Sequence, residues 1–226
     1  MGPLASAELL ATLYRLHTPR REQDAPAVVL LSDPSVPDRT EAILKGETAE
    51  LAERLAGAIE TLVEAGAGRV VIACFTIHHV LPELPAALRR RVVSLVDLTV
   101  EQILADPRPR LLLATTGSRR SGLFTGHPRW GEAAEWMALP SEADQEALHE
   151  RLYRLKGGAP PAETALWLEE LAERYPGTDG FVFGCTELHL LARPLAERWG
   201  EEGLRGRVVD ALHTVARRAP ELAAGA

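Results

Sequence analysis

The chain has 226 residues, of which 46% are hydrophobic and 25% charged, and its formal net charge is -7. These values exclude disordered and fibrous proteins, and the length fits either two compact domains or one larger α/β unit. Nucleic acid is excluded as an expected partner, because the charge balance is acidic and the basic run Arg89-Arg90-Arg91 is short. No apolar run approaches the roughly 20 residues that a membrane span requires, and the start of the chain lacks the pattern of a signal peptide. We therefore expect a cytoplasmic protein with no membrane partner.

Short apolar runs rich in β-branched residues alternate along the chain with amphipathic runs. The spacing of apolar residues by three or four predicts helices over residues 41–64 and 162–175. Repeated strand and helix units form parallel sheets that are covered on both faces. The sequence therefore predicts an α/β fold. The predicted strands are residues 27–31, 70–73, 92–96, 111–114, 181–183 and 207–209.

Two segments about half a chain length apart resemble each other. In each segment a strand-like run ends at a cysteine, Cys74 or Cys185, and a histidine follows four residues later, His78 or His189. These are the only two cysteines in the chain, so they do not form a disulfide framework. The function of the two cysteines therefore has to be inferred from the residues around them.

The repeat continues beyond the cysteines, because each half ends with a short strand followed by an aspartate, Asp97 or Asp210. We predict two pseudo-symmetric, doubly wound parallel-sheet domains with the site in the cleft between them. The first domain would comprise residues 1–105, rejoined by the helix of residues 210–226, and the second residues 106–209. The alternative is a chance likeness between two common strand-to-helix junctions.

A cysteine at the carboxyl end of a parallel strand lies beside the free N–H groups of the next helix, where ligands bind in α/β folds. Such N–H groups stabilise a thiolate, so Cys74 and Cys185 can each act as a base near neutral pH. Two thiols on opposite sides of one small anion would suit inversion at an acidic carbon. The alternative is that each cysteine is a small buried residue of the core.

The two Cys-x-x-x-His units raise a second possibility, a tetrahedral zinc site. Each unit runs directly from a strand into an apolar helix, whereas structural zinc sites usually join small, loop-rich pieces, so we expect no metal. His78 and His189 then belong to the first helical turn, where they hold a thiol or a ligand, or are satisfied by neighbouring backbone.

Two cations stand at positions that suit a carboxylate ligand. Arg39 follows a stiff, proline-containing loop in which Asp38 or Thr40 can cap the next helix. A guanidinium there matches a carboxylate bidentately, and the alternative is a surface arginine at a helix entry. Lys156, before Gly157-Gly158, is the other candidate, although Lys-Gly-Gly also commonly ends a helix.

These residues together resemble the aspartate/glutamate racemase superfamily and, within it, the aspartate racemase branch. The likeness rests on five separated motifs spread over nearly the whole chain. They are the opening loop Met1-Gly2-Pro3-Leu4-Ala5-Ser6, the segment Pro37-Asp38-Arg39-Thr40, the first cysteine motif Cys74-Phe75-Thr76-Ile77-His78, the segment Lys156-Gly157-Gly158, and the second cysteine motif Gly184-Cys185-Thr186-Glu187-Leu188.

The resemblance implies racemisation of an acidic amino acid, with aspartate first and glutamate as a second substrate, without pyridoxal phosphate or any other cofactor. It makes Cys74 and Cys185 the two catalytic bases, and it implies a homodimer. Arg39 and Lys156 would bind the side-chain carboxylate, and Thr76 and Thr186 the α-carboxylate. The full set of expected substrate-binding residues is Met1, Arg39, Phe75, Thr76, Thr116, Lys156, Thr186 and Glu187. For Glu187, a structural hydrogen-bonding role is an equal alternative.

The sequence departs from the family in two places. Phe75 stands where the family usually has asparagine, so an amide that can bind substrate is absent and the substrate is left open. The family also begins with a strand before its glycine-rich loop, so we expect either a start upstream of Met1 or a first sheet that lacks a strand. The alternative functions are isomerisation or decarboxylation of a small dicarboxylate, or binding of a carboxylate without turnover.

Overall fold

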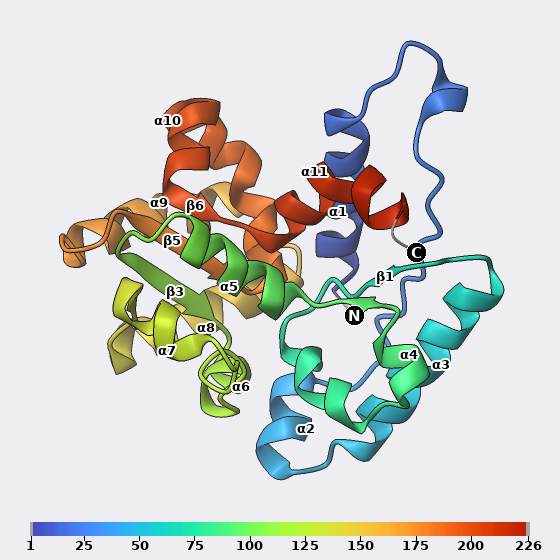
Figure 1. Ribbon diagram of the computed structural model, residues 1–226. Coiled ribbons are helices and arrows are strands. Elements are labelled where there is room, and N and C mark those ends of the chain that lie inside the picture. The colour runs from blue at the N-terminus through green and yellow to red at the C-terminus, as the bar shows by residue number, and fades with distance from the viewer. Residues whose placement is uncertain (1, 225–226) are drawn as a thin grey trace.

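The computed structural model describes residues 2–224 and consists of helices that alternate with short strands (Figure 1). Every strand pair in this part of the chain is parallel, which confirms the predicted α/β fold. The strands form a two-stranded sheet of order β1-β2 and a four-stranded sheet of order β4-β3-β5-β6. Their bounds are β1 (Val70–Val71), β2 (Val92–Val93), β3 (Arg110–Ala114), β4 (Met137–Ala138), β5 (Gly180–Gly184) and β6 (Val208–Val209).

Helices make up most of the structure, and none of those described is long and apolar enough to cross a membrane. The α-helices are α1 (Pro3–Leu16), α2 (Arg39–Lys45), α3 (Ala49–Glu64), α4 (Ala86–Arg89), α5 (Leu95–Ala105), α6 (Thr116–Arg120), α7 (Trp130–Ala133), α8 (Glu142–Lys156), α9 (Pro161–Arg174), α10 (Ala192–Arg207) and α11 (Ala211–Ala224). The short 3-10 helices are η1 (Glu22–Asp24), η2 (Thr76–Glu83), η3 (Ala134–Trp136) and η4 (Thr186–Leu191).

The central strands β3 and β5 are buried along their whole length. Successive side chains of a strand point to opposite faces, and the core is divided accordingly. Leu112 and Val182 lie in a cluster with residues of α5 and α11, whereas Leu113 and Phe183 lie in a cluster with residues of α8 and α9. Helices therefore cover both faces of this sheet, as the near-continuous apolar runs predict.

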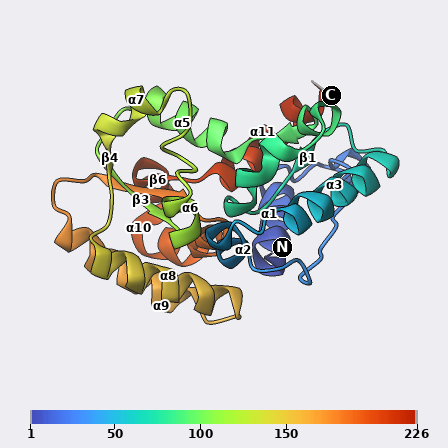
Figure 2. The same ribbon diagram turned by 90° about the horizontal axis from the view of Figure 1, so that it is seen from below.

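The last helix, α11, leaves the edge strand β6 and packs against α1 and α5 (Figure 1). On the other side of the molecule, α2 and α6 lie side by side (Figure 2). A third apolar cluster joins α2, α3 and η2 to the strand β1. Chain segments distant in sequence thus meet along the line where the two sheets adjoin.

The prediction of a strand at residues 27–31 is wrong, because this segment forms no regular secondary structure. Val28, Val29, Leu30 and Leu31 are 43–52% exposed, and the last three of them border a cavity of about 960 Å³ together with β1 and α3. An apolar run predicts burial, but a strand also needs a neighbour for its backbone N–H and C=O groups. No described strand pairs with this segment.

Several predicted boundaries also differ from the structure. The strand expected over residues 70–73 ends at Val71. The helix expected over residues 41–64 is two helices, because Gly46 adopts a left-handed conformation with φ of 75° and ends α2. The strand expected over residues 92–96 stops at Val93, since the Ser94 side chain accepts a hydrogen bond from the backbone of Asp97 and begins α5. In the latter two places a local capping interaction overrides the apolar pattern.

Candidate active site

The candidate site lies at the carboxyl edge of the four-stranded sheet. The adjacent parallel strands β3 and β5 end there at Ala114 and Gly184, so the residues that follow them are neighbours. Thr115 follows β3 and caps α6, with its hydroxyl accepting from the backbone N–H of Ser118 at 3.1 Å. Cys185 follows β5 directly and begins η4.

The first cysteine motif reaches the same edge from the other sheet. Cys74 is buried just after β1, and the residues after it form η2. The Thr76 hydroxyl lies 3.0 Å from the hydroxyl oxygens of both Thr115 and Ser118. This buried cluster of hydroxyl groups attaches the first motif to the end of β3.

The two cysteine motifs contact each other directly. The hydroxyl of Thr186 donates to the carbonyl oxygen of Ala73 at 3.1 Å. Because these residues are the immediate neighbours of Cys185 and Cys74, the bond brings together the backbones that carry the two thiols. The segments matched by the sequence repeat are therefore side by side.

Glu187 is the closest polar partner of the second thiol. The Sγ atom of Cys185 donates to Oε2 of Glu187 at 3.0 Å, and both side chains are buried. Burial and the Glu187 carboxylate raise the pKa of Cys185 well above its ordinary value, and Lys156 only partly opposes them. The thiol is therefore protonated at neutral pH. Gly2 lies against this carboxylate so closely that a Cβ atom there would collide with Oε1 of Glu187.

Two cations lie near the thiols: Arg39 interacts with Cys74, and Lys156 interacts with Cys185 and, more weakly, with Cys74. Burial lowers the pKa of Arg39, but the sulfur of Cys74 and the carboxylate of Asp38 raise it on balance. Burial likewise lowers the pKa of Lys156, but Cys185 and Glu187 raise it on balance. Both side chains therefore remain charged in a partly buried place that contains sulfur atoms.

Arg39 has unused hydrogen-bonding capacity. Its Nη1 atom donates to the carbonyl oxygens of Val36 and Pro37, at 3.3 and 3.1 Å. Its Nε atom is buried and has no partner among the described residues. A buried guanidinium N–H of this kind is costly unless an anion accepts it.

Tyr153 is a site residue that the sequence reasoning missed. Its hydroxyl donates to Oδ2 of Asp38 at 2.8 Å, and the Nζ atom of Lys156 lies 3.9 Å from the centre of its ring. The ring also packs against His149, with the two centroids 4.5 Å apart. The available signal was the spacing, since residues three apart on a helix share a face and Tyr153 therefore lies beside Lys156.

Helices α6 and α2 pack closely at Gly117 and Thr40. A Cβ atom on Gly117 would lie 2.8 Å from Cα of Thr40, closer than real side-chain contacts. Thr40 is itself buried. Only a glycine at this place allows α6 to reach α2, and so to bring Thr115 and Ser118 close to the helix that begins with Arg39.

Not every predicted substrate-binding side chain faces the two thiols. The Phe75 ring is buried in the core, 5.4 Å from the ring of Phe124 between centroids, so its side chain is not available to a ligand. Thr116 is half-buried at the start of α6, and its backbone N–H donates to Nδ1 of His149 at 3.4 Å. The predicted residue Met1 lies outside the described residues.

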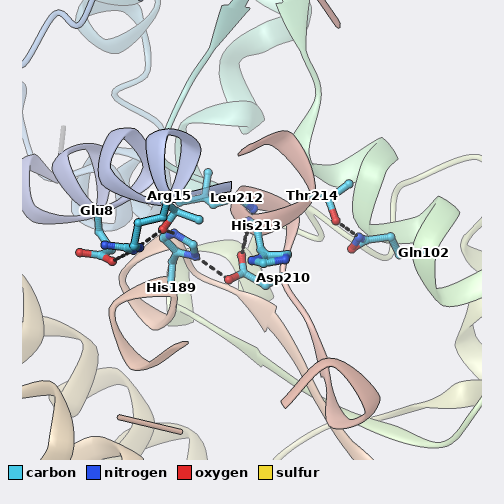
Figure 3. Close-up of polar contacts among 9 residues, drawn as sticks. Glu8, Arg15, Gln102, His189, Asp210, Leu212, His213 and Thr214 are labelled. Atoms are coloured by element: carbon cyan, nitrogen blue, oxygen red, sulfur yellow. Dashed lines mark hydrogen bonds and ion pairs between the residues drawn. The ribbon is translucent and has the colours of Figure 1, made fainter. Parts of the chain in front are cut away.

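The zinc alternative has no support, because both histidines use their ring nitrogens elsewhere. His78 uses Nδ1 toward the carbonyl oxygen of Cys74 at 2.8 Å and accepts the backbone N–H of Leu95 on Nε2 at 3.1 Å. His189 lies 2.6 Å from Oδ2 of Asp210 through Nδ1 (Figure 3). Its Nε2 atom lies 3.1 Å from the Thr12 hydroxyl. No group of three or more ligating side chains that could hold a metal occurs within residues 2–224.

Comparisons with known proteins identify the family and the fold of the chain. Residues 1–219 match the model of the Asp/Glu/hydantoin racemase family. The structure is similar to Picrophilus torridus aspartate racemase, with a TM-score of 0.80 at 21% identity over 99% of this chain and 90% of that one. An aspartate racemase homologue from Pyrococcus horikoshii OT3 gives a TM-score of 0.67 at 20% identity, over 98% of this chain and 95% of that one.

A more distant likeness is to the glutamate racemase of Francisella tularensis in complex with D-glutamate. The TM-score is 0.59 at 11% identity, over 96% of this chain and 76% of the other. At these identities the structural comparisons establish the fold, and the match to the family model establishes the family.

Proposed function

The chain belongs to the Asp/Glu/hydantoin racemase family, and from this premise we propose that it racemises aspartate by a two-thiol mechanism that uses no cofactor. Cys74 and Cys185 are the two acid–base groups. The observation that carries the proposal is the bond from Thr186 to Ala73, which joins the neighbours of the two thiols. Two cations, Arg39 and Lys156, lie near the sulfur atoms.

The roles of the two sulfur atoms are assigned from their surroundings. Cys185 is held as a thiol by burial and by Glu187, so it begins as the acid. We assign the role of base to Cys74, the cysteine beside Arg39. The two groups then have complementary roles in the reaction.

The reaction transfers one proton to the protein and one from it. The Cys74 thiolate removes the α-proton, so an S–H bond forms and the electron pair of the C–H bond stays on the α-carbon, stabilised by the carboxylate. The S–H of Cys185 then gives its proton to the opposite face of that carbon, which leaves a Cys185 thiolate. Binding of the opposite enantiomer runs the same steps in reverse.

An acidic substrate is favoured by the cations of the site. The unpartnered Nε of Arg39 offers a hydrogen bond to a carboxylate, and Lys156 supplies a second positive charge. We assign both to the distal carboxylate, and the hydroxyl groups of Thr76 and Thr186 to the α-carboxylate. The homodimer and the cytoplasmic location stay predictions from the sequence.

Incubation of L-aspartate with the protein in D₂O tests the proposal. We expect formation of D-aspartate together with incorporation of deuterium at the α-carbon, followed by circular dichroism and by proton NMR. The matched control is the variant in which Cys74 and Cys185 are both serine, which should show neither change because an alcohol is far too weak a base. Unchanged chirality and no deuterium incorporation in the folded protein would refute the assignment.

A second reaction on the same scaffold is favoured by one observation, the burial of Phe75 where the family usually has an amide. Without that amide the site is free to accept a dicarboxylate that has no amino group. Assays with maleate and with malonate-type acids, run beside aspartate, distinguish isomerisation or decarboxylation from racemisation.

A further inference from the structure

Asp38 uses its two carboxylate oxygens for two different helices. Oδ1 accepts the backbone N–H of Glu41 at 2.9 Å, which caps α2 and fixes the helix whose first residue is Arg39. Oδ2 accepts the hydroxyl of Tyr153, which belongs to α8 and lies 115 residues further along the chain. One carboxylate thus fastens the start of α2 to the face of α8.

Tyr153 makes the second connection through its ring. Nζ of Lys156 lies 3.9 Å from the ring centre, a distance at which a cation is attracted to an aromatic face. His149 supports the ring from one helical turn earlier. The position of the Lys156 ammonium group is therefore tied to the tyrosine, and through its hydroxyl to Asp38.

The protonation states fit this arrangement. Burial raises the pKa of Asp38, but the bonds from the Glu41 backbone and the Tyr153 hydroxyl lower it on balance, so Asp38 is a carboxylate. Burial also raises the pKa of Tyr153, so its hydroxyl keeps the proton that it donates. The bond has one donor and one charged acceptor, which is the stronger kind of hydrogen bond.

The consequence is a fixed distance between two cations that come from different parts of the chain. Arg39 follows Asp38 directly, and Lys156 rests on the ring of Tyr153. Neither cation has a direct bond to the other that holds the pair in place. The bond between Asp38 and Tyr153, both of which are half-buried, connects the two segments that carry the two cations.

We propose that Tyr153, through its bond to Asp38, is a positioning residue that sets the length of dicarboxylate the site accepts. The inference rests on the proposed function, because it takes Arg39 and Lys156 as the groups that bind the distal carboxylate. With the bond in place, the two cations converge at one distance from the thiols and select an amino acid with one methylene group, aspartate. Without it, α2 and α8 separate and glutamate is accepted as well.

The variant Tyr153→Phe tests this inference, because it keeps the ring under Lys156 and removes only the hydroxyl. We expect the ratio of kcat/KM for aspartate to that for glutamate to fall about tenfold, mostly through KM for aspartate, as the loss of one hydrogen bond to a charged group predicts. Tyr175→Phe is the matched control, since the Tyr175 hydroxyl donates to Oδ2 of Asp144 at the same 2.8 Å but away from the site.

A second readout separates this inference from the proposed function. Calorimetric titration with D-aspartate and D-glutamate measures binding whether or not the protein turns either over. If the wild type racemises neither acid but Tyr153→Phe still loses its preference for aspartate in binding, the proposed function fails and the positioning role stands.

Three results would overturn the positioning role. They are an unchanged aspartate-to-glutamate ratio in Tyr153→Phe, an equal loss of preference in Tyr175→Phe, or a loss of kcat for both acids with no change in their ratio. Thermal unfolding of the two variants, followed by circular dichroism, checks that both remain folded at the assay temperature.

Discussion

The two cysteine motifs have the same spacing but different electrostatic surroundings. In the first, His78 bonds only to backbone groups, the carbonyl of Cys74 and the N–H of Leu95, and burial lowers its pKa to about 4. In the second, burial alone would lower the pKa of His189, but the Asp210 carboxylate raises it above its ordinary value. One histidine is neutral and the other forms a buried ion pair.

The aspartates that the repeat matches also behave differently. Asp210 caps α11, with Oδ1 accepting the backbone N–H groups of Leu212 and His213, and its Oδ2 binds His189 (Figure 3). Asp97 is exposed in the first turn of α5 and pairs with His127 at 3.1 Å. The comparison teaches that a shared spacing places equivalent atoms but leaves each half free to acquire its own charge pattern.

Single serine substitutions at the two cysteines test whether the two halves contribute equivalent acid–base groups. We expect Cys74→Ser and Cys185→Ser each to lower racemisation about 10²- to 10⁴-fold, since each removes one acid–base group. Each variant keeps one thiol, so each should still exchange the α-proton of one enantiomer with solvent, and the enantiomer should differ between them. Proton NMR of L- and D-aspartate in D₂O measures this. Exchange of the same enantiomer by both variants would contradict the opposed arrangement.

The free energy of unfolding of alanine variants measures how differently the two aspartates contribute to stability. Asp210→Ala leaves His189 buried without its partner, and we expect it to lower the free energy of unfolding by about 3–5 kcal/mol. Asp97→Ala removes an exposed carboxylate and should cost less than about 1 kcal/mol. Urea titration followed by circular dichroism gives both values, and equal effects would mean that the buried pair contributes no more than the exposed one.

The two histidines should give opposite dependences of stability on pH. The folded-state pKa of His78 lies below its ordinary value of 6.5, so its contribution is fully present above pH 6.5 and is lost as the pH falls toward 4. The shift corresponds to about 3 kcal/mol. His189 has a raised pKa, so its contribution is present at low pH and is lost as the pH rises through the folded-state value.

Urea unfolding of the wild type and of His78→Asn between pH 4 and pH 7 isolates the first of these dependences. We expect the difference in free energy between the two proteins to shrink as the pH falls. A difference that stays constant over this range would show that His78 does not change its protonation on unfolding.

Local patterns predicted much of the fold and the centre of the site. The strand-to-helix alternation predicted parallel sheets. The motif spacing predicted that each cysteine ends a strand, and Cys185 does follow β5 directly, whereas β1 ends at Val71, three residues before Cys74. Gly46 shows where such patterns fail, because the apolar period continues across it while the backbone turns left-handed. The strand expected over residues 27–31 fails for a different reason, since pairing depends on a neighbour that local composition does not reveal.

The remaining site contacts join residues that no local pattern connects. Tyr153 meets Asp38 across 115 residues, and His189 meets Thr12 across 177 residues. The resemblance named Arg39 and Lys156 but did not show that Arg39 interacts with Cys74 and Lys156 with both sulfur atoms. Such assignments depend on how helices pack, which is decided by shape and burial over the whole molecule.

The close approach of α6 to α2 limits which positions can be substituted to change the substrate range. Even an alanine methyl group at Gly117 would press on the backbone of Thr40 and displace the helix that begins with Arg39. We therefore expect most variants of Gly117 to be inactive, because α6 and α2 no longer pack correctly. Substitutions at Tyr153 are the better choice, because a smaller side chain there releases Asp38 and lets α2 move relative to α8 without pressing on the backbone of Thr40.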